Sequence, residues 1–325
     1  MVRPVVAVLL LTAAFILTLG ACARSAGSIS RFTEPDAELP LGFPADFPAL
    51  TDSGGNGAGE QTTGFGGSRD DRSAKRPVIL IHGNGTPAQE IWRHYRQWLL
   101  DSGYRSGDVW ALNYLGERGG AEGETPFRDN IADVRLFVDA VIDYLEVDRV
   151  DIVAVSLGCH LARGYVLGAR FGEDSDGEIV FDPSLRRADR VRSMVLISGA
   201  NYGLGTAIAD PDWNTESELF SMTAENSFFE VDGVEDHTPF SDQIHYATVA
   251  AEFDYPETLY RLSDRPAAAW RTSSLEGAVN QIVGPDEGLG YPDSRTVDSN
   301  FANHRRLVRD PFVFATYVLA HLNRD

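Results

Sequence analysis

The residue with the clearest chemical signature is a serine between an expected strand and an expected helix. The segment Val150-Asp-Ile-Val-Ala-Val-Ser-Leu-Gly-Cys159 runs from a β-branched apolar stretch through Ser156 into a helical pattern. The small residues Ala154 and Gly158 allow a tight turn that holds the serine Oγ out at the edge of a sheet. The N-terminus of the helix would direct backbone N–H groups at the reacting oxygen. We therefore predict a nucleophilic serine; the alternative is a buried serine in an ordinary strand-to-helix turn.

A glycine-containing loop follows the first expected strand of the same pattern. The segment reads Pro77-Val-Ile-Leu-Ile-His-Gly-Asn-Gly85, and its glycines let the backbone fold back toward the nucleophile. We expect the backbone N–H groups of Asn84 and Leu157 to hold the oxyanion of a tetrahedral intermediate, each contributing about 3–4 kcal/mol. A phosphate-binding loop is excluded because the glycine spacing is wrong and the loop has no lysine. His82 is expected to shape the loop rather than to carry protons.

Apolar strand patterns and amphipathic helical patterns alternate from residue 77 onward. The strands are expected at 78–81, 109–114, 150–155, 191–197 and 279–283, and the helices at 87–100, after Thr125-Pro126, at 157–170 and from 310 to about 322. This alternation predicts an α/β fold, with a mostly parallel sheet covered by helices on both faces. Residues 200–275 are rich in aromatic and acidic side chains and break the rhythm. We expect them to form a cap insertion over a pocket, with extra packing layers as the alternative.

Composition restricts the partners of the chain. The sequence has 325 residues, with 28 basic and 48 acidic side chains and a net charge of −20. Because such a negatively charged surface repels the phosphate backbone, nucleic acid is not an expected partner. No metal cluster stands out; His237 and His245 near Asp236 and Asp242 are the nearest approach to one. Cys159 is expected to lack a disulfide partner.

The N-terminus has the pattern of an export signal. Arg3 precedes an apolar run over residues 4–19, which is short for a membrane span of about 20 residues. Leu19-Gly-Ala-Cys22 resembles a bacterial lipobox, in which the cysteine is acylated; cleavage at an A-x-A site that releases the protein is the alternative. Residues 23–75 are rich in Gly and Pro and are expected to be a disordered linker before a catalytic domain over 76–325.

Four segments in order carry a resemblance to a known family. PVILIHGNG, VWALNYLG, VDIVAVSLG and VLISGANYG resemble the corresponding segments of class 2 bacterial lipases and of the related extracellular polyhydroxybutyrate depolymerases. The resemblance covers residues 77 to about 205 and a short stretch near 279–310. It implies an α/β-hydrolase fold that hydrolyses carboxylic esters without an organic cofactor. Val155 departs from the family, which usually has histidine before the serine.

The serine needs a base, and the base needs an orienting carboxylate. In this fold the chain order is serine, acid, histidine. His304 meets that order in an expected loop before the last helix, where the resemblance also implies a histidine. The other six histidines lie before the serine, in the helix after it, in the expected cap or in the last helix: His82, His94, His160, His237, His245 and His321.

The acid should follow a strand and precede the base. After the expected strand 279–283 the chain turns at Gly284-Pro285 and presents Asp286 and Glu287. The resemblance implies an aspartate at this turn and therefore favours Asp286. Asp293 and Asp298 are weaker candidates.

Together these patterns predict an exported serine ester hydrolase, a lipase or carboxylesterase, with Ser156, His304 and Asp286 as its triad. The expected substrate is an ester, which includes lipids, and a lipidated Cys22 would tether the enzyme to a membrane. A depolymerase of polyhydroxyalkanoate or another polyester is one alternative. A catalytically inactive α/β-hydrolase that acts as a binding protein is another, and amide hydrolysis uses the same triad.

Overall fold

A computed structural model places most of the expected catalytic domain. It describes residues 32, 42–50, 63–83, 86–114, 127–170, 180–201, 230–231, 234–235, 242–254, 272–284 and 297–324. Cys22, Asn84 and Asp286 lie outside these ranges, as do the export signal and much of the expected cap.

The described part of the chain is organised around a seven-stranded sheet. Its order is β1-β3-β2-β4-β7-β10-β11, with every neighbouring pair parallel except β1 and β3. The strands are β1 (Thr63–Phe65), β2 (Val78–Ile81), β3 (Val109–Asn113), β4 (Val150–Val155), β7 (Val191–Ile197), β10 (His245–Ala251) and β11 (Val279–Val283). Two short hairpins add β5 (Ala169–Arg170) with β6 (Val180–Phe181) and β8 (Glu230–Val231) with β9 (Val234–Glu235).

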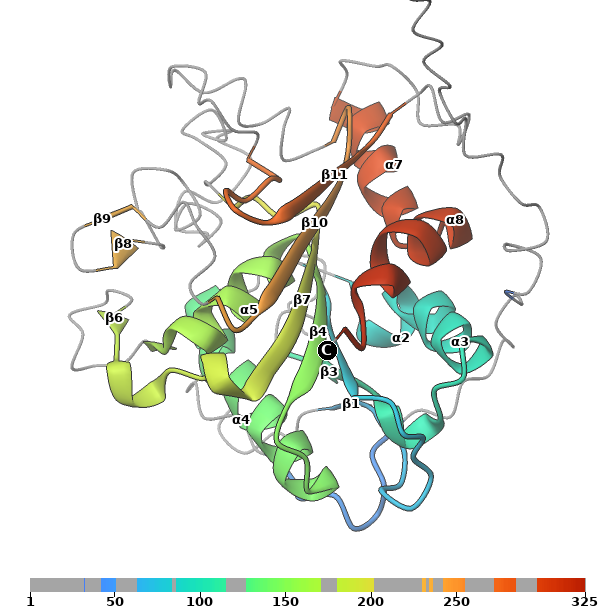
Figure 1. Cartoon of the computed structure of the whole chain (residues 1–325), viewed down its shortest axis with the longest axis vertical. Helices are drawn as coiled ribbons and strands as arrows, with labels where there is room; N and C mark the ends of the chain where they lie inside the picture. Colours follow the sequence, from blue (N-terminus) through green and yellow to red (C-terminus); the bar gives the residue numbers. More distant parts are fainter. Residues whose placement is uncertain are drawn as a thin grey trace, which may run out of the picture.

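Helices cover both faces of this sheet, as the alternating pattern predicts. The helices are α2 (Ala88–Ile91), α3 (Arg93–Asp101), α4 (Phe127–Leu145), α5 (Leu157–Leu167), α7 (Val297–Leu307) and α8 (Pro311–Val313). Figure 1 shows α4 and α5 on one side of the sheet and α2, α3, α7 and α8 on the other. The expected α/β-hydrolase architecture is therefore confirmed.

The sheet is apolar on both faces because successive side chains of a strand point to opposite sides. In β2, Ile79 and Ile81 belong to the core on the α4 and α5 side, whereas Val78 and Leu80 belong to the core on the α3 and α8 side. This arrangement explains why the central strands read as unbroken apolar runs rather than as alternating ones.

A strand within the region expected to be a cap corrects the sequence interpretation of 200–275. Residues 245–251 form β10, which pairs with β7 on one side and β11 on the other. The sheet therefore resumes well before Val279. The strand reads HYATVAA, and its three alanines have low β propensity, so the segment does not look like a strand in isolation. It is buried along nearly its whole length.

Part of the expected linker is also folded. Thr63–Phe65 forms β1, and Gly42 bridges to Phe65. Phe47 is buried, with its ring 5.0 Å from that of Trp110 and 5.3 Å from that of Tyr144. Gly and Pro dominate the composition here, but Phe47 packs into the core on the α4 side of the sheet and gives the segment enough apolar burial to order it. The outer domain boundaries remain a prediction.

The C-terminal helices differ in detail from the expected ones. His304 lies inside α7 rather than in a loop; the polar segment SNFANH has low helix propensity, and burial of one face of the helix outweighs it. The last expected helix begins as predicted, with the Asp310 side chain accepting a hydrogen bond from Phe312 N–H and a proline in the first turn. It continues as a π turn over Phe314–Val318 and a 3₁₀ turn over Leu319–His321.

Gly158 allows α5 to lie against β2, which gives a direct test of the packing. A Cβ at this position would lie 2.4 Å from the carbonyl oxygen of His82 and 2.5 Å from that of Ile81. Alanine is normally the better helix residue, but here we expect Gly158→Ala to lower the free energy of unfolding by about 1–3 kcal/mol through overpacking. Urea denaturation measures the change. A variant as stable as the parent would contradict the close approach of α5 to β2.

Candidate functional site

Ser156 occupies a strained backbone position between β4 and α5. Its φ is 54° and its ψ is −124°, and no loop residue separates the strand from the helix. The Ser156 N–H donates to the Ile197 carbonyl at 2.9 Å, and its carbonyl accepts from the Cys159 N–H at 3.0 Å. A non-glycine residue with such a φ is uncommon and such strain is found at functional sites. The side chain is partly exposed. This is the turn that the sequence predicts for a nucleophilic serine.

The loop after β2 lies directly against this serine. A Cβ on Gly83 would be 2.9 Å from the Ser156 Cβ and 3.5 Å from its Oγ, so only glycine fits at this approach. Leu157, one of the two expected oxyanion donors, is the first residue of α5, where backbone N–H groups have no partner within the helix. The other expected donor, Asn84, lies outside the described residues.

His304 is held by two side chains at the same ring nitrogen. Its Nδ1 lies 3.0 Å from Oδ1 of Asp254 and 2.5 Å from Oγ of Ser198. Asp254 and Ser198 are fully buried, and His304 is 8% exposed. The ring of Phe301, one turn earlier in α7, stacks on the imidazole with centroids 6.1 Å apart and 12° between the planes. This arrangement fixes both the position and the plane of the imidazole.

The sheet explains how these groups come together. β4, β7 and β10 are consecutive in the sheet, with Val155 paired to Ile197 and Ile197 paired to Val249. Ser156 and Ser198 directly follow the first two of these strands, and Asp254 comes three residues after the third. The carboxyl ends of parallel strands meet at one edge, which is where open α/β sheets bind ligands. All three side chains are therefore at the same edge, and α7 brings His304 to it.

Among the described residues, the carboxylate at His304 is Asp254, which the sequence analysis did not single out. Asp286 lies outside the described residues, so its position is untested, but Asp254 contacts the histidine. Asp254 was missed because it follows β10, inside the region expected to be a cap. The strand order identifies Asp254, because β10 lies next to β7 in the sheet and Asp254 is the first fully buried acid after β10.

Three other histidines have pKa values lowered to about 4 by burial: His82, His160 and His321. His82 Nδ1 lies 2.7 Å from the Gly83 carbonyl, and its Nε2 accepts from the Tyr114 N–H at 3.4 Å. Its ring stacks on Tyr114 at 3.8 Å. Both ring nitrogens are occupied by the backbone, so His82 shapes the loop, as the sequence predicts.

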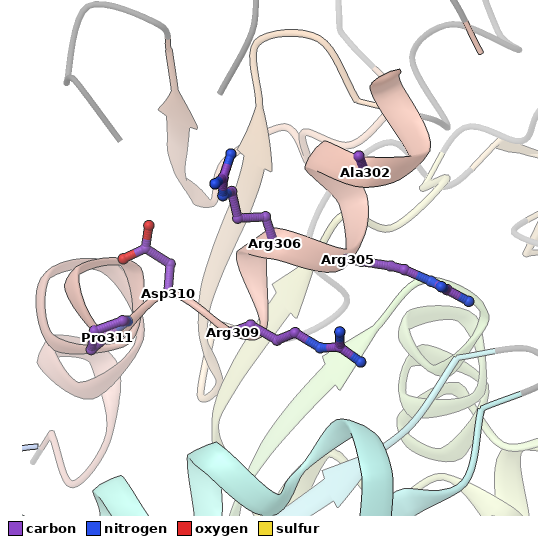
Figure 2. A pocket seen from close by; sticks show the side chains of 6 residues that line it. All are labelled: Ala302, Arg305, Arg306, Arg309, Asp310 and Pro311. Atoms are coloured by element: carbon purple, nitrogen blue, oxygen red, sulfur yellow. The ribbon is translucent and has the colours of Figure 1, made fainter. Parts of the chain in front are cut away.

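A pocket of about 510 Å³ lies at the junction of α7 and α8 (Figure 2). It is lined by Ala302, Arg305, Arg306, Arg309, Asp310 and Pro311. Ala302, Arg305 and Arg306 are exposed positions of α7, whereas His304 is buried in the same helix. The arginines complement the negative C-terminal end of α7, and Arg309 also pairs with Glu90 at 3.1 Å. The described ranges contain no group of three or more His, Cys, Asp or Glu side chains placed to hold a metal ion.

The geometry at the sheet edge agrees with a comparison of sequences. Residues 75–222 match the family model of the class 2 lipases. This part of the chain is therefore similar to class 2 lipases. The match includes Ser156 and Leu157 and ends before Asp254 and His304. It confirms the resemblance carried by the four segments and supports a carboxylic ester hydrolase. No curated protein sequence matches this chain.

The chain is also similar to solved structures of lipases and esterases. The mature lipase BlEst2 of Bacillus licheniformis is 13% identical, with a TM-score of 0.50 over 80% of this chain and 97% of that one. Lipase B of Aspergillus fumigatus is 16% identical, with a TM-score of 0.49 over 87% of this chain and 56% of that one. Esterase 2 of Thermogutta terrifontis is 12% identical, with a TM-score of 0.44 over 89% and 98%. The similarity to BlEst2 shows the α/β-hydrolase fold.

The buried neutral histidines predict a loss of stability in mild acid. Each binds a proton near pH 6.5 in the unfolded chain but only near pH 4 in the folded one. Their contribution to the free energy of unfolding is complete above pH 6.5. It falls as the pH drops, by up to about 1.4 kcal/mol per pH unit for each group. Urea denaturation at pH 7.5, 6.5 and 5.5 measures the slope.

His321→Gln tests the same prediction on one group. The free energy of unfolding of this variant should depend less on pH between pH 6.5 and 5. The difference should correspond to close to one bound proton, because glutamine does not titrate. A parent protein whose stability is constant over this range would show that these histidines are not buried in the neutral form.

Proposed function

We propose that Ser156, His304 and Asp254 form the catalytic triad of an ester hydrolase that works through a covalent acyl-enzyme. The observation that carries this proposal is the buried contact between Asp254 and His304 at the sheet edge where β4 ends in the strained Ser156. A serine hydroxyl is a weak nucleophile at neutral pH without such a base and its orienting acid.

The reaction follows from the role of each group. Asp254 accepts a hydrogen bond from Nδ1–H of His304, which leaves the lone pair of Nε2 to take the Ser156 proton. The Ser156 Oγ then attacks the ester carbonyl, and the N–H groups of Leu157 and Asn84 hold the oxyanion. The imidazolium returns its proton to the departing alcohol. Water deprotonated by His304 attacks the acyl-enzyme and releases the carboxylic acid.

The assignment of Asp254 replaces that of Asp286. Asp254 is fully buried within 3.0 Å of the imidazole, and a buried carboxylate is the group that best stabilises the imidazolium formed in the reaction. Its Oδ2 accepts from the Ala251 N–H at 3.2 Å, which fixes the orientation of the carboxylate.

Export is the second part of the proposed function. It is supported by Arg3, the apolar run over residues 4–19 and the lipobox-like segment that ends at Cys22. Acylation of Cys22 would tether the hydrolase domain to a membrane through the segment that precedes β1. Over the residues that the structure describes, no helix is both long and apolar enough to cross a membrane.

The two candidate acids are distinguished by matched asparagine variants. We expect Asp254→Asn to lower kcat for a p-nitrophenyl ester about 10⁴-fold, because the amide no longer selects the tautomer with Nδ1–H. Asp286→Asn should change kcat by no more than a few-fold. Circular dichroism and thermal melting confirm that each variant is folded. The opposite ranking of the two variants would restore Asp286 as the acid.

A further inference from the structure

We infer that Ser198 is a positioning residue for His304, as a second acceptor for its Nδ1–H. This inference rests on the proposed role of His304 as the base. The Ser198 Oγ lies 2.5 Å from Nδ1, on the same nitrogen that faces Asp254, and both side chains are fully buried.

The backbone conformation of Ser198 indicates that its side-chain hydroxyl has a function. Its φ is 52°, a left-handed value that glycine adopts freely and that serine adopts at an energetic cost. Glycine would therefore be the residue of lowest strain at this turn after β7. Among the hydrogen bonds of the described residues, the Ser198 Oγ is paired with His304, and its N–H donates to the Val249 carbonyl at 2.7 Å. The group that a glycine would lack is the one that contacts the imidazole.

The direction of the hydrogen bond follows from the proton on Nδ1. An ionised carboxylate only accepts, so the contact with Asp254 requires Nδ1 to carry the hydrogen. Ser198 must then accept from the same N–H. Two acceptors on Nδ1 favour the tautomer whose Nε2 lone pair is available to Ser156, and they stabilise the imidazolium more than one acceptor does.

The same geometry argues against Ser198 as the nucleophile. A nucleophile and its orienting acid must face different nitrogens of the imidazole, and here Ser198 and Asp254 face the same one. Ser198 is also fully buried, whereas Ser156 is partly exposed at the turn. Ser198 therefore acts through His304 and does not touch the ester.

The test compares Ser198→Gly with Ser198→Ala in the full chain. Both variants lack the hydroxyl, but glycine relieves the backbone strain and alanine keeps it. We expect both to lower kcat about tenfold with KM nearly unchanged, since a hydrogen bond to a charged group is lost only where the imidazolium forms. Their melting temperatures should differ, with Ser198→Gly the more stable of the two.

Ser193→Ala is the matched control. Ser193 lies in β7, the strand that Ser198 follows, and is fully buried, and its Oγ has no hydrogen-bond partner in the described part of the chain. Its removal should leave kcat unchanged.

Three results would overturn the inference. If kcat follows melting temperature, so that Ser198→Gly is as active as the parent, the hydroxyl has no positioning role. If folded Ser198→Gly loses all activity while Ser156→Ala keeps it, Ser198 is the nucleophile. If the folded parent protein itself cleaves no p-nitrophenyl ester, the proposed function fails, and the positioning role fails with it.

Discussion

The turn from β4 directly into α5 is the constraint on which the site depends. It places Ser156 at a φ of 54°, and strain of this kind has a cost of about 1–3 kcal/mol. The cost is offset by packing: every residue of α5 is buried, and β4 lies in the middle of the sheet. Gly158 and Gly83 allow the closest contacts on either side of the serine. A larger residue at either position would move the turn.

The remainder of the site is organised by strand order. β7 and β10 follow β4 across the sheet, so their carboxyl ends bring Ser198 and Asp254 to the edge that carries Ser156. Residues 50 and 106 positions before His304 in the sequence thus contact its imidazole. The helix α7 contributes His304 from the face of the sheet opposite α5 (Figure 1). A rigid sheet is well suited to this task, since a small displacement of a catalytic group lowers the rate strongly.

Much of this fold could be predicted from sequence because its central strands are apolar on both faces. The segments 78–81, 150–155, 191–197 and 279–283 were identified with the bounds that the structure shows. Ser156 was identifiable because the strained turn requires small neighbours in sequence. β10 was not, since its alanines gain strand structure only from pairing with β7 and β11. The acid after β10 was missed for the same reason.

The contacts of His304 show a second limit of local sequence patterns. The histidine was identified from its place in the chain order, but its partners follow strands and lie 50 and 106 residues away in the sequence. The role of Ser198 depends on a backbone angle and a tautomer that no sequence motif records. Likewise, Phe47 anchors a Gly- and Pro-rich segment through contacts with Trp110 and Tyr144 that are distant in sequence.

The central claim is that His304 activates Ser156, and covalent labelling with a fluorophosphonate tests it most directly. Intact mass and peptide mapping of the labelled protein should show one adduct, located on Ser156. The adduct should be absent from Ser156→Ala and should form much more slowly in His304→Asn. An adduct on Ser198, or no adduct on folded parent protein, would contradict the assignment of the nucleophile.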